Sequence, residues 1–596
     1  MRKSIWLVLV AMLVVGLVTS VAAGCGGKTS TTTTAGGTAT TSGPATTVGG
    51  TGTTAAAGEP VMGGILKTGE ISHPSKFGFP ARVFGPDQFF EGLFLEMMFN
   101  PTDKIDVFTP ALAESWELTA DKSAYVFHLR KGVKFHDGTD FNAAAAKFCW
   151  DLAISSPPAG PPGPPPGAAG PPASGGPDAT AGGPPPSGGP AATAAGGPPA
   201  GGAPAGPPPD FAFVKSIEVV DDYTVKVNLT KWTNQVLSFI GRKTWAVFSP
   251  TAYEKNGADW MDTNPVGTGA FMLKSFTPDQ SLALEKNPNY WGKDAQGRQL
   301  PYLDGVEIQI FSDATTELIA LQAGQIDAVG QVSAIGAQQL QNDPKFTLDK
   351  FAGPVQMTEM NTTDPNSVWS DVRMRQALEY ALDKEGLNKS VGMGFTPPVY
   401  EIIHSVSEVV DPGTTPRTYD PAKSKELMAA AGHATAECTL SYDTNRTPPN
   451  LPEAVQANLA AVGITVKLNG LNTPAFAAIS TKVPQGNDII FQGLRGGAPN
   501  VLQGAMEMYG KGTIYFPAFS PPQEFYTLMD KAQAYDKVAD ALPDIAQMEK
   551  IAYDDAGVIP LNLNIFISVV SSKLKNMNYF YGNTPTPWFN EAWLVK

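Results

Sequence analysis

The hydrophobic positions of the chain switch between two spacings, and each switch is marked by a glycine. Between residues 453 and 468, apolar side chains first recur every three or four positions and then, after Gly463, at alternate positions. The first pattern predicts an amphipathic helix and the second a strand. Asp420-Pro421 predicts another helix start, with an N-cap and a proline in the first turn, and Gly432 predicts its left-handed end.

Shorter stretches show the same succession. Leu318 and Leu321 precede Gly324 and a short apolar strand at 326–329. Runs of helix, glycine and strand build α/β lobes, in which helices cover a sheet. Residues 219–227 are strand-like on both sides of an Asp-Asp pair and predict a β-hairpin.

Two segments have no hydrophobic pattern. Residues 26–59 are almost wholly Gly, Thr, Ser and Ala, and residues 157–209 contain only Pro, Gly, Ala, Ser and Thr apart from Asp178. Such segments cannot bury apolar area, so we expect a disordered tether at 26–59 and a disordered surface insertion at 157–209. The insertion has no strict three-residue period, which excludes collagen.

Residues 1–25 predict an export signal. Two basic residues precede an apolar stretch from 5 to 21, and small residues then lead to Cys25. A cysteine at this place resembles the lipobox of bacterial lipoproteins, in which the thiol is acylated, although Ala22 stands where that box usually has leucine. We therefore expect a lipid anchor at Cys25. Ordinary cleavage with free secretion, or a retained membrane helix, are the alternatives.

Composition narrows the functional classes. The chain has 596 residues, a mass of 62.8 kDa and a formal net charge of −14. This length predicts two or three lobes, and the acidity argues against nucleic acid as a partner. No GxSxG, HExxH or Cys/His nucleophile pairing is present, so we do not expect an enzyme. Paired carboxylates leave a secreted enzyme as an alternative.

Cysteine and histidine are too sparse to predict a metal centre. The three cysteines and five histidines form no cluster with ligand spacing, and we expect no cofactor. His404 and His433 are isolated, whereas a bare metal ion needs several convergent ligands. A disulfide between Cys149 and Cys438 is the alternative to two free thiols.

Five stretches of the chain, taken together, resemble one family. They are Pro110-Ala-Leu-Ala-Glu-Ser-Trp116 with its continuation to Thr139, Asn264-Pro-Val-Gly-Thr-Gly-Ala-Phe271 with Asn287-Pro-Asn-Tyr-Trp291, Ala320-Leu-Gln-Ala-Gly-Gln-Ile-Asp327, Met360-Asn-Thr-Thr363 with Asp371-Val-Arg-Met-Arg-Gln-Ala-Leu378, and Tyr419-Asp-Pro-Ala-Lys423. Their order and types resemble the family 5 extracellular solute-binding proteins, the peptide/nickel type of ABC-importer receptors. The resemblance extends from about residue 63 to 580.

The resemblance implies an α/β fold, a two-lobed clam like the periplasmic binding proteins (type II, cluster C-like) with an extra subdomain. It implies two chain crossings that form a hinge near Met360 and Asn564. Carried over to this sequence, lobe I comprises 60–100, 264–355 and 565–596, the extra subdomain comprises 101–263 with the insertion at 157–209, and lobe II comprises 356–564.

Several motif residues have a structural interpretation. Residues 265–269 predict a sharp turn whose glycines take positive φ. Asp371 predicts an acid at the positive end of a helix, with Arg373 and Arg375 as a buried or lobe-bridging pair. The apolar residues of the first motif are assigned to the core: Leu112, Trp116, Phe127, Leu129, Val133 and Phe135.

The expected ligand loop departs from the family pattern. Peptide-binding members usually carry Gly-Trp-x-x-Asp-Tyr-x-Asp/Glu-Pro in lobe II, and the matching stretch here begins at Gly493. Leu494 replaces the aromatic residue, and Gly497 occupies the position of the first Asp, so a peptide ammonium would lose its counter-charge. Arg495 favours a carboxylate or other anionic group, unless it points to solvent. Asn500 completes the candidate loop.

Four further residues are candidate ligand contacts. Phe90 and Met98 lie in a stretch rich in Phe and Met, which the resemblance places beside the cleft, and such side chains suit an apolar or variable ligand. Helix core is the alternative interpretation of that stretch. Trp369 and Asn361 lie near the implied hinge.

We therefore expect an extracytoplasmic solute-binding receptor. It would capture a small organic solute, with a non-peptide or anionic solute favoured over oligopeptide, and deliver it to ABC permease subunits with a cytoplasmic ATPase. We expect a monomer, lipid-anchored in the periplasm or on the outer face of a bacterial cell membrane. A surface ligand sensor without transport, and an oligopeptide receptor proper, are the alternatives.

Overall fold

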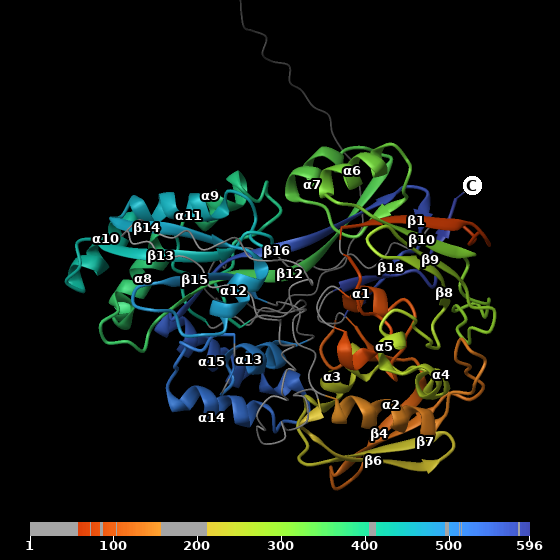
Figure 1. Cartoon of the computed structure of the whole chain (residues 1–596). Helices are drawn as coiled ribbons and strands as arrows, with labels where there is room; N and C mark the ends of the chain where they lie inside the picture. Colours follow the sequence, from red (N-terminus) through yellow and green to blue (C-terminus); the bar gives the residue numbers. More distant parts are fainter. Residues whose placement is uncertain are drawn as a thin grey trace, which may run out of the picture. The chain divides into compact units, whose positions relative to one another are not determined.

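A mixed sheet of ten strands runs through the protein (Figure 1). Its strands are β1 (Ile65–Glu70), β8 (Phe271–Thr277), β9 (Ser281–Lys286), β10 (Gly305–Ile310), β11 (Ala328–Val329), β12 (Phe346–Met360), β13 (Ala436–Asp443), β14 (Ile464–Leu471), β15 (Ile489–Leu494) and β16 (Val558–Ser571). Their spatial order is β14-β13-β15-β12-β16-β11-β1-β10-β9-β8. β1 is parallel to β10 and β11, and β13 is parallel to β14 and β15.

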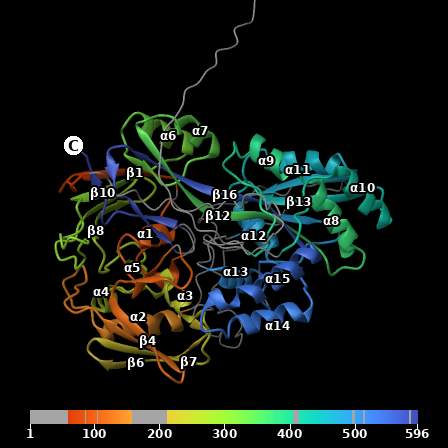
Figure 2. The ribbon, with the colours of Figure 1, turned by 180° about the vertical axis from the view of Figure 1, so that it is seen from behind.

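The computed structural model describes residues 58–71, 73–83, 87–102, 104–156, 211–403, 413–494, 500–511, 513, 515–581 and 585–595. All of them belong to one compact unit, Val48–Lys596, which Figure 2 shows from behind. The export signal with Cys25, nearly all of the 26–59 tether and the 157–209 insertion lie outside the described residues.

Two long strands join the halves of the sheet. β12 and β16 pair antiparallel over most of their length, from Phe346 opposite Ser571 to Glu359 opposite Val558. Their register shifts between Ala352 and Val355, and again after Gln356. Such bulges bend a strand and increase its twist. The implied crossing at Asn564 coincides with the first shift, whereas Met360 lies at the end of β12. The lobe boundaries stay predictions.

Helices cover both faces of the sheet, as the α/β pattern predicts. The chain forms α1 (Asp87–Glu91), α2 (Ala143–Ser155), α3 (Val236–Ile240), α4 (Pro250–Asn256), α5 (Ala258–Met261), α6 (Ala314–Gln322), α7 (Ala334–Leu340), α8 (Val372–Ala381), α9 (Lys384–Ser390), α10 (Pro421–Ala430), α11 (Leu451–Ala460), α12 (Thr473–Ser480), α13 (Val501–Tyr509), α14 (Gln523–Ala532) and α15 (Leu542–Asp555). One core packs α8, α10 and α11 on the sheet, and a separate core packs α13, α14 and α15 against β12.

The protein has a second, smaller sheet of four strands, which we call the satellite. It contains β4 (Ala113–Leu118), β5 (Ala124–Leu129), β7 (Thr224–Leu229) and β6 (Val214–Asp221), in that order. β6 and β7 form the predicted hairpin, since Asp221 lies opposite Thr224. Short strand pairs add β2 (Phe99–Pro101) with β3 (Phe108–Pro110), β17 (Leu574–Lys575) with β20 (Trp593–Leu594), and β18 (Asn578–Tyr581) with β19 (Pro585–Trp588).

The predicted core residues of the first motif pack together around the smaller sheet. Leu112, Phe127, Leu129, Val133 and Phe135 are each 3% exposed or less, and Trp116 packs partly buried against them. Several of the rings lie close enough to interact directly; the centroids of Phe99 and Trp116 are 4.8 Å apart. This satellite is therefore held by aromatic burial.

The helix ends follow the sequence signals. Asp420 caps α10 by accepting a hydrogen bond from the Lys423 amide, and Gly432 beyond it has φ +86°. α11 ends at Ala460, and Gly463, with φ +99°, turns the chain into β14. Both glycines take a backbone conformation that a side chain would strain.

The turn at residues 265–269 corrects one prediction. Neither Gly267 nor Gly269 is among the glycines with positive φ. Glycine is required at both positions because the backbone at Phe94 passes close to them. A Cβ on Gly267 would lie 2.1 Å from the carbonyl oxygen of Phe94. His136 fastens the same turn: its Nδ1 accepts the Gly267 amide at 3.2 Å, and its Nε2 lies 3.1 Å from the Gly269 carbonyl oxygen.

The disulfide alternative is wrong, because Cys149 and Cys438 are both free and buried. The Cys149 thiol donates to the carbonyl oxygen of Phe248 at 3.1 Å. Burial raises the pKa of each thiol to about 12, so neither is a reactive thiolate.

Candidate functional site

The register of the large sheet brings strand ends from both halves toward one place. Val329 of β11 lies opposite Val569 of β16, which in turn lies opposite Leu348 of β12. β11 and β1 therefore run in the direction of β12, with their carboxyl ends toward residue 350. β15 runs the opposite way and ends with Leu494 opposite Val355. The carboxyl ends thus approach residues 350–356 of β12 from opposite directions.

We call residues 350–356 of β12 and 562–567 of β16 the strand crossing. These segments face each other across the first register shift, where Ala352 lies opposite Ile565 and Val355 opposite Leu563. In α/β sheets, ligands bind beyond the carboxyl ends of parallel strands. The strand crossing, with the ends of β1, β11 and β15 around it, is therefore the candidate site.

Three amide side chains lie on the strand crossing. Gln356 is opposite Gly493 on one side and Asn562 on the other, and Asn564 follows Asn562 on the same face. Gln356 and Asn562 are 1% and 2% exposed. Buried polar side chains normally carry hydrogen bonds.

Two carboxyl groups lie at the β1 end of the site. Glu70 is the last residue of β1, and its Oε1 lies 2.7 Å from where a Cβ on Gly330 would be. Glu317 of α6 is 2% exposed and lies against Gly69. Burial raises the pKa of Glu317 to about 7; burial and the negative charge of Glu317 raise that of Glu70 to about 8. Glu70 is thus mostly uncharged at neutral pH.

In the other half of the sheet, β13 ends at Asp443 and β15 ends at the ligand loop. Asp443 is the last residue of β13, is 3% exposed, and accepts the hydroxyl of Thr473 at 3.1 Å. Arg446 lies 3.6 Å from its second oxygen. Arg495 and Gly497 of the ligand loop, and the side chain of Leu494, lie outside the described residues, so these candidates stay predictions.

The remaining sequence candidates do not come together at the strand crossing. Phe90 and Met98 are 0% and 1% exposed and belong to the core around the smaller sheet, where Phe90 packs on Phe77 and Phe89. Phe90 is thus a core residue of α1, as the helix-core alternative predicts, whereas Met98 is a core residue outside any helix. As ligand contacts they stay untested predictions.

Three polar candidates are engaged within the protein. The Trp369 indole donates to the Asn487 carbonyl oxygen at 2.8 Å, and Asn361 donates to the Pro484 carbonyl oxygen at 2.8 Å. Asn500 caps α13 and donates to the Ser238 hydroxyl of α3 at 3.1 Å. Their side chains stabilise local structure here, and their role as ligand contacts stays a prediction.

Asn500 belongs to a wider set of contacts between residues 101–263 and residues 500–541. The two segments are far apart in the chain, and each supplies both charged and neutral partners. The others are the ion pairs Arg242–Glu507 and Lys122–Asp536, the bond from Asn234 Nδ2 to the Ala532 carbonyl oxygen at 2.9 Å, and the bond from the Val538 amide to Asp106 Oδ2 at 2.9 Å. They tie the satellite to α13 and α14.

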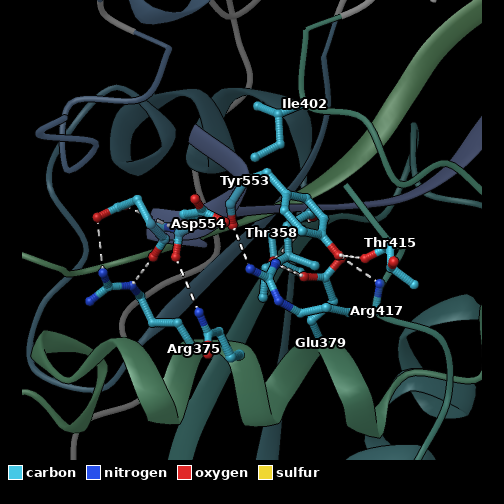
Figure 3. Close-up of polar contacts among 12 residues, drawn as sticks. Thr358, Arg375, Glu379, Ile402, Thr415, Arg417, Tyr553 and Asp554 are labelled. Atoms are coloured by element: carbon cyan, nitrogen blue, oxygen red, sulfur yellow. Dashed lines mark hydrogen bonds and ion pairs between the residues drawn. The ribbon is translucent and has the colours of Figure 1, made fainter. Parts of the chain in front are cut away.

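A buried ionic network lies under α8, and Figure 3 shows its members. Arg417 donates to Glu379 at 2.7 Å, and the Tyr553 hydroxyl accepts the Arg417 amide at 2.6 Å. Arg375, 5% exposed, pairs with Asp555 at 3.0 Å. Arg375 also donates to the carbonyl oxygens of Trp369 and Ser370 and is buried, whereas Arg373 is exposed and pairs with Asp371.

Sequence reasoning missed the amides of the strand crossing. A signal was present, because Leu561-Asn-Leu-Asn-Ile565 places two amides at alternate positions inside an apolar run. Alternation of this kind ordinarily indicates a strand with one face in water. Only the folded structure shows that Asn562 is buried, with 2% of its surface exposed.

Comparisons with known proteins agree with this architecture. Residues 107–532 match the model of the bacterial extracellular solute-binding proteins, family 5 (middle region). The chain is 27% identical over 491 residues to heme-binding protein A of Haemophilus influenzae, covering 78% of this chain and 81% of that protein. It is 26% identical over 398 residues to the glutathione-binding protein GsiB of Salmonella typhimurium, covering 65% of each.

Solved structures share the fold. DppA of Helicobacter pylori in complex with the peptide STSA matches with a TM-score of 0.67 and 22% identity, over 90% of this chain and 99% of that one. HbpA2 of Haemophilus parasuis matches with a TM-score of 0.69 and 19% identity, over 89% of this chain and 100% of that one. These are two-lobed periplasmic binding proteins, and the α/β clam expected from the sequence is confirmed.

The fold is that of a two-lobed binding protein. The chain belongs to the family 5 bacterial extracellular solute-binding proteins, the family that serves ABC importers. It is an extracytoplasmic receptor for a solute, and its family consists of receptors rather than enzymes. Among the described residues, no helix is long and apolar enough to cross a bilayer.

Proposed function

We propose that the solute binds at the strand crossing and that the two lobes close on it. The register of β12 and β16 supports this, because it directs the carboxyl ends of β1 and β11 and that of β15 toward the same seven residues of β12. A solute there touches both lobes. Closure follows when the solute gains contacts that exist only in the closed state.

The contacts between residues 101–263 and 500–541 support closure as the working motion. Arg242 and Glu507 form an ion pair whose side chains are 12% and 21% exposed. Asn234 and Asn500 add neutral hydrogen bonds between the same two segments. Such contacts favour the closed state by a few kcal/mol at most, so the solute supplies the remainder.

The closed form is the one that ABC permease subunits with a cytoplasmic ATPase would recognise. Acylation at Cys25 would hold the receptor at the periplasmic or outer face of the cell membrane, with residues 26–59 as a leash of roughly 30 Å. A monomer suffices for this cycle. A surface sensor without transport is the second candidate, and it requires the same closure.

The solute is a small organic molecule. Relatives are named for heme and glutathione, and solved relatives hold a peptide and agropinic acid. The preference for an anion rests on Arg495, and Gly497 argues against a peptide held by a free amino terminus. The described polar groups of the site are amides and carboxyls, which do not favour an anion by themselves.

Native mass spectrometry and a thermal-shift screen test the proposal. The purified chain is screened against peptides, organic acids, sugars and amides. Saturable stabilisation that grows with solute concentration is expected. Absence of both a co-purified solute and any stabilisation contradicts the receptor function. Replacement of Cys25 by Ala should move the protein from the membrane fraction to the soluble fraction; an unchanged distribution contradicts the lipid anchor.

A further inference from the structure

Two of the three amides of the strand crossing lie against Gly493, a residue without a side chain. A Cβ built on Gly493 would lie 3.2 Å from Gln356 Oε1 and 4.0 Å from Asn564 Nδ2. Gly493 therefore shares a face of the sheet with both amides. The Gln356 side chain lies directly against the Gly493 backbone, because a Cβ there would be closer to Gln356 Oε1 than an ordinary van der Waals contact. Residue 493 has no positive φ, so the backbone alone does not require glycine there.

The amide atoms are buried but lack partners within the protein. Both Gln356 Oε1 and Gln356 Nε2 are inaccessible and make no hydrogen bond, and the same holds for Asn562 Oδ1. The Asn562 Nδ2 donates to Asn564 Oδ1 at 3.3 Å. A buried amide atom without a partner costs about 1–3 kcal/mol. Three such atoms in one place are unfavourable unless an ordered water or a bound solute completes their hydrogen bonds.

The unpartnered set offers both kinds of hydrogen-bonding atom. Gln356 presents one donor and one acceptor, and Asn562 Oδ1 presents a second acceptor. In the described part of the chain, no hydrogen bond or ion pair joins a charged side chain to Gln356, Asn562 or Asn564. Lys350 of the same strand lies over the Phe395 ring, 4.7 Å from its centroid. A charged solute group would find no counter-charge at the amides themselves.

We propose that Gln356, Asn562 and Asn564, beside Gly493, form a subsite that binds an uncharged amide group of the solute. An amide carries one N–H donor and one C=O acceptor, which complement the two ends of Gln356. The inference rests on the proposed function, since it concerns one part of the site at the strand crossing. It names the solute class as molecules with a neutral amide, such as acylated amines or the interior of a peptide.

Glu70, at the end of β1, is a further polar group of the candidate site with little charge at neutral pH. Its carboxyl lies on the bare backbone at Gly330, and its pKa, raised by burial and by Glu317, is about 8. It is therefore mostly a protonated acid at pH 7, able to donate one hydrogen bond and accept others.

Matched amide and ester probes test the subsite. Blocked dipeptides (N-acetylated and C-amidated) are compared with analogues in which one amide is replaced by an ester, which removes the N–H donor. Affinities are measured by calorimetry for the wild type, Gln356→Leu and Gly493→Val. The exposed Gln309→Leu of β10 is the matched control. For the wild type, we expect the ester to bind about tenfold more weakly at the sensitive position.

The variants should remove this preference by two different routes. Gln356→Leu removes the atoms that would bond the solute amide, so the amide and ester probes should bind equally. The four affinities form a double-mutant cycle, which gives the coupling energy between the probe's N–H group and Gln356. Gly493→Val keeps the amides but covers them, and should weaken both probes. Gln309→Leu should leave the tenfold preference unchanged.

Stability of the empty protein gives a second readout. Because Gln356→Leu removes buried atoms without partners, its melting temperature should equal or exceed that of the wild type. A lower value would mean that Gln356 is bonded within the empty protein, and would overturn the subsite.

The possible results separate the two proposals. Equal binding of amide and ester to the wild type, or an unchanged preference in Gln356→Leu, overturns the subsite and leaves the receptor function intact. Solutes without an amide that bind tightly and are insensitive to Gln356→Leu do the same. If no probe and no solute of the wider screen binds, both the receptor function and the subsite are contradicted.

Discussion

His136 should make the fold sensitive to mild acid. Its ring is held in the turn at 265–269 between the Gly267 amide and the Gly269 carbonyl oxygen, at 3.2 and 3.1 Å. Because Nδ1 accepts a hydrogen bond, the neutral ring with its proton on Nε2 fits this geometry, and a second proton does not. Burial accordingly lowers the pKa of His136 to about 4.

The size of the effect follows from the two pKa values. The unfolded chain has a histidine pKa of 6.5, and the folded protein has about 4. The neutral ring therefore contributes stability that is fully present above pH 6.5 and is lost as the pH falls through 6.5 toward 4. Between pH 7 and pH 4 this amounts to about 3 kcal/mol in the free energy of unfolding.

Denaturant unfolding at several pH values between 7 and 4 provides the assay. Many carboxyls also titrate in this range, so the quantity to compare is the difference between wild type and His136→Gln. The variant should be less stable at pH 7 but should lose about 3 kcal/mol less on acidification. The exposed His128→Gln should follow the wild type. Equal pH dependence for wild type and His136→Gln would refute the neutral, buried state of His136.

Three further predictions concern other parts of the structure. Gly267→Ala should destabilise by at least about 3 kcal/mol in chemical denaturation, because its Cβ would lie 2.1 Å from the Phe94 carbonyl oxygen. Burial raises the pKa of Glu359 from 4.5 to about 8, so Glu359→Gln should gain up to about 5 kcal/mol over the wild type above pH 8, and nothing near pH 4.5. Glu507→Gln should remove the ion pair with Arg242 and weaken solute binding about threefold to tenfold, mainly through faster dissociation in stopped flow.

Each of these has a matched control. Gly336→Ala lies in a helix, and the nearest atom to its Cβ would be in the flexible Leu318 side chain at 3.3 Å, so it should change stability by less than about 1 kcal/mol. Exposed Glu117→Gln should show no gain at high pH, and Glu426→Gln, which breaks an exposed ion pair with Lys423, should not change solute affinity. If a control behaves like its test variant, the explanation given for that variant is wrong.

Local signals predicted much of the secondary structure. The helix that begins after Asp420, the hairpin around residue 222 and the helix–strand unit of α11 and β14 all follow from capping residues, periodicity and glycine. These signals act over a few residues, so they survive without knowledge of the rest of the chain. The family, and with it the two-lobed α/β fold, followed from motifs spread over the body.

The same local logic failed where two distant segments approach each other. The glycines at 267 and 269 are required because the backbone at Phe94 passes close to them, and not because of their own φ angles. A single sequence shows a glycine in both cases. It cannot show which distant atom lies where the Cβ would be.

Sequence alone determined the lobed α/β class and the receptor family, because both depend on patterns within short stretches and on their order. Only the tertiary structure decided the candidate site. Gln356, Gly493 and Asn562 lie far apart in the chain and become neighbours through the pairing of β15, β12 and β16. Whether an amide in a strand lies in water or is buried without a partner depends on what covers that strand. That is a property of the packed sheet, and residue type and spacing do not contain it.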